Sequence, residues 1–331
     1  MIKTLLIDGE NLLRIGFNVV AYYHKEKHIG GLYHFINTLR RFVETHNYDK
    51  VVVFWDGENN SSSRKKIYHK YKDNRRTPMP DSDVESLLYQ KTRINQYLEE
   101  IFVRSVEVDN NEADDLIAYY CHISSNENKT IFSADRDLTQ LISETVSVYS
   151  PNTKETYKFG DKIKIYEAPI PHYNVKTYKI LVGDKSDNID GIYSLGEKKL
   201  LAFFPEMLDK MVTVSDILLR SEELLKENKD SNVLKNLLSG RTKDGIFGNE
   251  FFQINEQIID LSNPLITEDA KKIVELYCNE SLDPDGRGYK NLMKMMTEDG
   301  FFKFLPKYND GWVEFIRPFL KLTRKEKRNK K

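Results

Sequence analysis

Acidic side chains follow several apolar, strand-like segments of this chain, and carboxylate oxygens are the ligands that hard divalent cations prefer. Three of them fall within four residues, where mutual repulsion is strong unless a cation lies among them. Histidine and cysteine are absent from these clusters, which argues against zinc. The pattern predicts a Mg²⁺ or Mn²⁺ site built from Asp8, Asp56, Glu112, Asp114, Asp115, Asp135 and Asp137.

A further acidic group lies in a segment rich in glycine, aspartate and asparagine. Asp184 and Asp187 are spaced to share one helical turn or a tight loop. A turn and the start of a helix follow, and a helix start beside lysines is suited to a phosphate group. An ordinary connecting loop is the alternative interpretation. We predict a hairpin that binds a phosphate backbone through Gly191, Gly196, Lys198 and Lys199.

Residues 64–76 are rich in basic side chains, interleaved with aromatic ones. A solvated helix face is the usual explanation for such a run. The alternative is that Lys72 and Arg75, three residues apart, extend from one helical face toward a phosphate, with Tyr71 free to stack on an end base. Under that alternative the DNA contacts here are Arg64, Lys65, Tyr71, Lys72, Arg75 and Arg76.

The elements that must position these residues alternate between strand and helix patterns. Apolar runs predict buried parallel strands, amphipathic stretches predict covering helices, and this alternation indicates an α/β sheet. Asn111 is the expected N-cap of the helix that carries the central acids. The predicted strands are 4–7, 51–56, 102–108, 130–133 and 145–149, the predicted helices include 32–43 and 84–101, and the chain beyond 205 is mostly helical.

Composition sets the remaining bounds. The chain has 331 residues, of which 40% are hydrophobic and 31% charged, with a formal net charge of −1. The length favours two domains. No apolar run approaches a membrane span, the N-terminus reads as a strand and not as a signal peptide, and the 2 cysteines are expected as buried free thiols. A cytoplasmic monomer is the expectation.

The ordered series of these motifs resembles the flap endonuclease and 5′-3′ exonuclease family, closest to its bacteriophage members. The resemblance covers residues 1 to about 204. It rests on Asp8, Trp55-Asp56-Gly57, Tyr71-Lys72-Asp73-Asn74-Arg75, Glu112-Ala113-Asp114-Asp115, Ser133-Ala134-Asp135-Arg136-Asp137 and Gly183-Asp184-Lys185-Ser186-Asp187-Asn188-Ile189.

The resemblance implies a PIN-like parallel-sheet nuclease domain at 1–178, with a helical arch at about 64–95. A helix-hairpin-helix-type region and a C-terminal helical region with a basic tail would occupy 179–331. It implies two Mg²⁺ ions on Asp8, Asp56, Glu112, Asp114, Asp115, Asp135, Asp137, Asp184 and Asp187, and a K⁺ ion at the hairpin. In the hairpin, Ser194 stands where relatives have glycine, which costs about 1 kcal/mol if its φ is positive.

The activity implied is two-metal hydrolysis of phosphodiester bonds at 5′ flaps, nicks or RNA primers on duplex DNA, as in phage replication. The catalytic set would be Lys72, Arg75, Asp8 and Asp56. A single-strand-binding protein or a sliding clamp is an expected partner. The alternatives are a non-catalytic branched-DNA scaffold, a ribonuclease of the toxin PIN class, and a haloacid-dehalogenase-type phosphatase, whose second acid would be Glu10.

Overall fold

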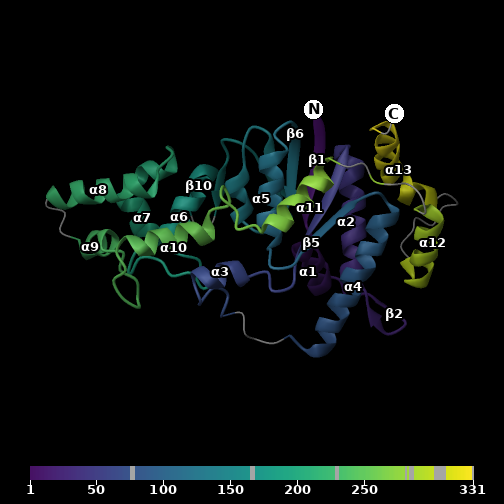
Figure 1. Cartoon of the computed structure of the whole chain (residues 1–331), viewed down its shortest axis with the longest axis horizontal. Helices are drawn as coiled ribbons and strands as arrows, with labels where there is room; N and C mark the ends of the chain where they lie inside the picture. Colours follow the sequence, from purple (N-terminus) through teal and green to yellow (C-terminus); the bar gives the residue numbers. More distant parts are fainter. Residues whose placement is uncertain are drawn as a thin grey trace.

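The computed structural model describes residues 1–74, 79–164, 168–227, 231–279, 282, 287–301 and 311–329. At its centre is a six-stranded sheet in the order β5-β4-β1-β6-β7-β8 (Figure 1). All neighbouring pairs are parallel except β7 with β8, so the predicted α/β class is confirmed. The strands are β1 (Ile2–Asp8), β4 (Lys50–Asp56), β5 (Arg104–Val108), β6 (Glu127–Phe132), β7 (Val146–Ser150) and β8 (Glu155–Tyr157).

Side chains of the central strands alternate between two cores because successive residues of a strand point to opposite faces. Leu6 and Val52 belong to one core, and Leu5 and Val53 to the other. The first core is covered by α5 (Ala113–Ile123) and α11 (Glu268–Asn279). The second is covered by α1 (Gly9–Val19), α2 (Gly30–His46) and α4 (Asp81–Glu100).

A helical lobe extends from the sheet, on the left in Figure 1. It contains α6 (Val175–Val182), α7 (Glu197–Phe203), α8 (Val214–Lys226), α9 (Asn232–Leu238) and α10 (Asn249–Ile259). The last helices, α12 (Tyr289–Glu298) and α13 (Gly311–Asn329), instead pack on α4 and α2, at the opposite end. The domain boundary at residue 179 stays a prediction.

Short elements connect these parts. They are β2 (Tyr23–His24), β3 (Lys27–His28), α3 (Ser62–Ile67), β9 (Lys162–Lys164), β10 (Pro169–Pro171) and the 3₁₀ turns η1 (Asp137–Leu141), η2 (His172–Asn174) and η3 (Pro205–Leu208). Within the described ranges, none of the helices is long and apolar enough to cross a membrane.

The predicted strands and helices are all present, with ends shifted by a few residues. One cap is wrong. The N-cap of α5 is Glu112, not Asn111, and the Glu112 side chain makes no capping hydrogen bond. The Asn111 side chain is engaged elsewhere, accepting a 2.9 Å hydrogen bond from Thr267 N and donating a 2.7 Å bond to Asp109 O. Cys121 is a buried free thiol, as predicted.

Candidate active site

The acidic strand ends meet at one edge of the sheet because β4, β1 and β6 are parallel neighbours. Asp8 accepts hydrogen bonds from Asn11 N (3.0 Å) and from Ser133 Oγ (2.8 Å), which joins the ends of β1 and β6. Asp56 Oδ1 accepts a 2.8 Å bond from Ala113 N, which places the first turn of α5 beside β4. The edge thus gathers acids from four different segments.

Burial and mutual repulsion disfavour the ionised forms of these acids. Burial raises the pKa of Asp8 to about 7, and the charges of Asp56 and Asp135 add to the shift. Burial also raises the pKa of Asp114 well above its ordinary value, followed by the charges of Asp135, Asp8 and Asp56. Without a cation, this cluster is electrostatically unfavourable when fully charged.

Asp137 lies in a second acidic group beside this cluster. Burial raises its pKa to about 7, although the Lys179 charge opposes the shift. Burial also raises the pKa of Asp184, but Lys179 and the bonds from Ser186 outweigh it and hold that pKa at about 2. Lys179 Nζ lies 2.6 Å from Asp184 Oδ2 and also pairs with Asp137. Sequence reasoning did not identify Lys179, whose position four residues before Gly183 was its only signal.

These shifts predict how stability depends on pH. Folded Asp8 and Asp137 keep protons up to about pH 7, whereas their ordinary pKa is 3.8. The folded state therefore binds more protons over this window, and stability falls as pH rises. In EDTA, we expect the free energy of unfolding to decrease as the pH rises from 3.8 to about 7. Urea unfolding at several pH values should show that the free energy of unfolding decreases less steeply with pH in Asp8→Asn than in the wild type. The same dependence on pH in both proteins would contradict the raised pKa of Asp8.

Glu112 is linked to the basic segment. Tyr71 Oη lies 3.1 Å from both Glu112 Oε2 and Asp187 Oδ2, and its single proton can be donated to only one of them at a time. Lys72 Nζ donates a 3.0 Å hydrogen bond to Glu112 Oε2. Burial, followed by the Glu112 charge, raises the pKa of Tyr71, so the phenol stays protonated. The contacts place a lysine charge directly at the edge of the carboxylate cluster.

Two predicted roles change because of one buried ion pair. Arg64 is 5% exposed and Asp115 is 1% exposed. The guanidinium binds both carboxylate oxygens of Asp115, and Arg64 Nε donates a 2.9 Å bond to Ile258 O. Asp115 Oδ1 also accepts a 3.0 Å bond from Leu265 N. Arg64 is thus too buried to contact DNA, and the contacts of Asp115 support a structural role in place of the predicted metal ligation.

The rest of the basic segment also differs from the prediction. Helix α3 ends at Ile67, and Lys72 lies in a turn with φ of 57°, so Lys72 does not project from a helical face. Lys72 N donates a 2.8 Å bond to Asp187 O, which holds this turn in place. Tyr71 is 2% exposed and cannot stack on a base in this conformation. Lys65 is exposed and pairs with Asp73, and Arg75 and Arg76 lie outside the described residues.

The predicted hairpin occupies the turn between α6 and α7. Asp184 and Ile189 pair across a tight loop, which is one of the two arrangements considered for this segment. Ser194 has φ of 65°, the strained conformation anticipated for this departure from glycine. A Cβ at Gly191 would lie 2.0 Å from Val182 O, so only glycine fits there. An open hollow of about 600 Å³ beside this turn is lined by Tyr178, Lys185, Ser194, Gly196, Lys198 and Lys199.

The donor set fits divalent cations. All its members are carboxylates, and Glu112 Oε1 is buried with no hydrogen-bond partner in the described part of the chain. Among the described residues, however, no three His, Cys, Asp or Glu side chains are arranged as a closed metal site. Lys72 on Glu112, and Lys179 on Asp137 and Asp184, account for part of this difference, because cationic groups occupy carboxylates that an ion would use.

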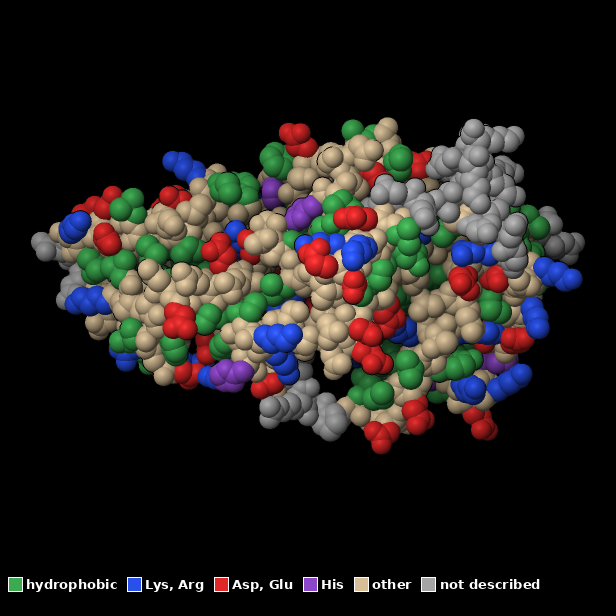
Figure 2. Space-filling view, viewed as in Figure 1, with side chains coloured by type: hydrophobic (Ala, Val, Ile, Leu, Met, Phe, Trp, Pro, Cys, Tyr) green, Lys and Arg blue, Asp and Glu red, His purple; other side chains and the backbone are tan. Residues whose placement is uncertain are grey.

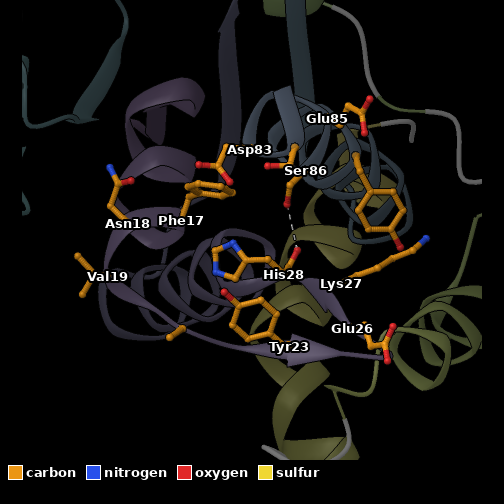
Figure 3. A pocket seen from close by; sticks show the side chains of 13 residues that line it. Phe17, Asn18, Val19, Tyr23, Glu26, Lys27, His28, Asp83, Glu85 and Ser86 are labelled. Atoms are coloured by element: carbon orange, nitrogen blue, oxygen red, sulfur yellow. Dashed lines mark hydrogen bonds between the residues drawn. The ribbon is translucent and has the colours of Figure 1, made fainter. Parts of the chain in front are cut away.

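The hollow in Figure 3 is separate from these acids. It has a volume of about 740 Å³ and lies between the end of α1, the β2–β3 hairpin and the start of α4. The centroid of the His28 ring lies 4.6 Å from the centroid of the Phe17 ring and 5.0 Å from that of the Tyr23 ring. Asp83 and Glu85, from the start of α4, also line it, and none of the predicted site residues contributes. Because none of the acids gathered at the sheet edge line this hollow, it is not the candidate active site.

Surface charge gives no broad basic patch on the visible face. Lys and Arg side chains are scattered there among Asp and Glu (Figure 2), in agreement with the net charge of −1. Binding of a polyanion would therefore depend on local basic segments, such as the one around Lys65, Lys70 and Lys72.

Comparisons with known proteins identify the family of this chain. The model of the 5′-3′ exonuclease N-terminal, resolvase-like domain matches residues 3–168. A 5′-3′ exonuclease of Halalkalibacterium halodurans is 31% identical over 295 residues, which cover 82% of this chain and 91% of that protein. DNA polymerase I of Caldicellulosiruptor bescii is 29% identical over 248 residues, but these cover only 28% of the polymerase.

A solved structure shares the fold. The bacteriophage T5 flap endonuclease, crystallised with DNA and metal ions, aligns with a TM-score of 0.60 at 17% identity. The alignment covers 97% of this chain and 99% of the phage protein. The family match over half the chain and the bacterial relative together confirm the resemblance inferred from the motifs. This chain belongs to the 5′-3′ exonuclease family.

Proposed function

We propose that this chain is a structure-specific 5′-nuclease that hydrolyses phosphodiester bonds near 5′ ends, flaps or RNA primers on duplex DNA. The single observation that carries the proposal is the convergence of acids from the ends of β1, β4 and β6 and from the start of α5. Family membership favours a nuclease over a haloacid-dehalogenase-type phosphatase. Removal of primers during phage DNA replication is the role that fits best.

Two Mg²⁺ ions are the proposed cofactors, with Mn²⁺ able to substitute. One would be held by Asp8, Asp56, Glu112, Asp114 and Asp135, and the other by Asp137, Asp184 and Asp187. When bound, such ions lower the pKa of water and stabilise the leaving oxygen. Lys72 would neutralise charge on the phosphate, and Lys179 would hold Asp137 and Asp184 in place, as its contacts with both indicate.

Duplex DNA with a 5′ flap, nick or RNA primer is the proposed substrate. Its backbone would meet the turn at Gly191 and Gly196, together with Lys198 and Lys199, and a K⁺ ion could be held there by backbone carbonyls. Arg75 and Arg76 are proposed as further DNA contacts on the basis of the sequence. A single-strand-binding protein or sliding clamp as partner, a monomeric state and residence in the cytoplasm of the host complete the proposal.

Cleavage of a 5′-labelled flap duplex tests this function directly. Wild-type protein is incubated with Mg²⁺, with Mn²⁺ and with EDTA, and the labelled fragments are sized. Short 5′ fragments that form only with a metal support the nuclease, and their lengths separate flap cutting from exonuclease action. Tight duplex binding without cleavage under any metal would reject the nuclease and favour the non-catalytic scaffold.

Lys72→Met should slow cleavage by roughly 10²-fold, because removing one group that stabilises transition-state charge typically has this effect. Its amine lies 3.0 Å from Glu112, where the phosphate must react. Single-turnover rates at saturating enzyme are the measurement. Lys65→Met is the matched control, since Lys65 pairs with Asp73 at 3.1 Å and is solvent-exposed. An unchanged rate in Lys72→Met at saturating enzyme would mean that Lys72 acts only in binding, and an equal loss in Lys65→Met would mean that the effect is not specific to Lys72.

A further inference from the structure

The loop 239–248 between α9 and α10 is folded as a small hairpin. Arg241 and Ile246 pair across it as an antiparallel bridge. Gly240 has φ of 58°, and a Cβ there would lie 2.1 Å from Gly248 O, so the base of the hairpin closes tightly. The two strands of the loop are therefore held together, and its tip has a defined shape.

The hairpin loop is fixed to the turn that we propose to bind DNA. Tyr193 N donates a 2.7 Å hydrogen bond to Arg241 O, and Asn236 Nδ2 donates a 3.1 Å bond to Tyr193 O. The Arg241 guanidinium lies over the Tyr193 ring, 5.6 Å from its centroid. The loop thus continues the surface formed by the turn 191–196.

The same loop also contacts the basic segment beside the carboxylates. Asp244 at its tip forms an ion pair with Lys70, two residues before Lys72. Asn188 Nδ2 donates a 2.7 Å bond to Lys70 O, which joins the segment to the acidic loop as well. In Figure 1 the loop between α9 and α10 extends from the lobe on the same side as α3. The loop therefore contacts both the basic segment that carries Lys72 and the turn 191–196.

The tip combines exposed apolar and basic side chains. Ile246 is 66% exposed and Phe247 is 43% exposed, although they are adjacent in an ordered loop. Arg241 and Lys243 are exposed beside them. Adjacent large apolar side chains exposed on a folded hairpin favour a binding surface, and flanking cations favour a polyanion as its partner.

We propose that the loop 239–248 is a second duplex-DNA contact. Arg241 and Lys243 bind phosphates on either side, while Ile246 and Phe247 lie against sugars and base edges in the minor groove, where apolar side chains serve as wedges. The inference rests on the proposed function in one respect, namely that duplex DNA is the ligand. It adds an element that the recognised motifs do not contain.

Fluorescence anisotropy with a labelled 5′-flap duplex in EDTA measures this contact without cleavage. Ile246→Ala/Phe247→Ala should weaken binding about tenfold, since truncated anchors at an interface commonly have such effects. The salt dependence of the binding constant of this variant should equal that of the wild type. Arg241→Gln/Lys243→Gln should instead reduce the salt slope by about 2, one for each lost phosphate contact. Thermal melting checks that both variants are folded.

Met211→Ala/Leu219→Ala is the matched control, because these apolar residues of the same lobe are 71% and 60% exposed. Ile246→Leu/Phe247→Leu should restore affinity. Wild-type affinity in the Ile246→Ala/Phe247→Ala variant, or an equal loss in the control, would overturn the proposal. Cleavage with Mg²⁺ is measured separately. If the loop substitutions weaken binding but the wild type does not cleave DNA, the proposed nuclease activity is rejected and the loop contact stands. If the wild type cleaves DNA and the loop substitutions leave binding unchanged, the loop contact is rejected and the nuclease activity stands.

Discussion

Asp114→Asn should reduce cleavage of a 5′-flap duplex by about 10³-fold or more, while leaving the protein folded. The activity loss follows because a bound cation supplies several kcal/mol of transition-state stabilisation, and each 1.36 kcal/mol is a factor of ten in rate. Asp114 is the acid whose pKa is raised by burial and then by Asp135, Asp8, Asp56 and Glu112 together, so it faces the centre of the cluster. Single-turnover cleavage in Mg²⁺ is the measurement.

For the same variant, we expect no loss of stability. Because the substitution removes one of several mutually repelling charges, its melting temperature in EDTA should equal or exceed that of the wild type. Asp209→Asn is the matched control, since the Asp209 side chain is 75% exposed and pairs with Lys162 far from the cluster. Activity within tenfold of wild type in Asp114→Asn would sink the assignment of this acid to the active site.

Arg64→Met should lower the free energy of unfolding by about 3–5 kcal/mol, because it leaves the Asp115 carboxylate buried without its partner. The pair joins α3 to α5, and the bond from Arg64 to Ile258 O adds α10. Its loss therefore loosens the helical lobe and the basic segment together. Urea unfolding followed by circular dichroism measures the effect.

Two further variants test whether the effect is specific to the buried pair of Arg64 and Asp115. Arg64→Met/Asp115→Asn should recover part of the loss, since the neutral amide can still accept the hydrogen bond from Leu265 N. Arg220→Met, which removes only exposed pairs with Glu223 and Glu227, should have a much smaller effect, because exposed ion pairs contribute little to stability. If Arg64→Met were no more costly than Arg220→Met, the buried pair would not have the structural role assigned to it.

The sequence by itself determined the elements that build the site. Apolar runs ending in Asp8 and Asp56 are local patterns, and a buried parallel strand requires such runs. Because parallel strands end at one edge, the order of strands and acids along the chain was enough to predict that the acids converge. Family motifs then identified the chemistry, and the comparisons confirmed the family.

Partners that are distant in sequence were decided only by the tertiary structure. Arg64 binds Asp115 and Ile258 O, which are 51 and 194 residues away. Tyr71 is buried between Glu112 and Asp187, 41 and 116 residues away, so an aromatic residue predicted to stack on DNA contacts the carboxylates. Side-chain periodicity and local spacing contain no information about such pairs, because it is the packing of whole elements that selects which charges lose their water and must find a partner.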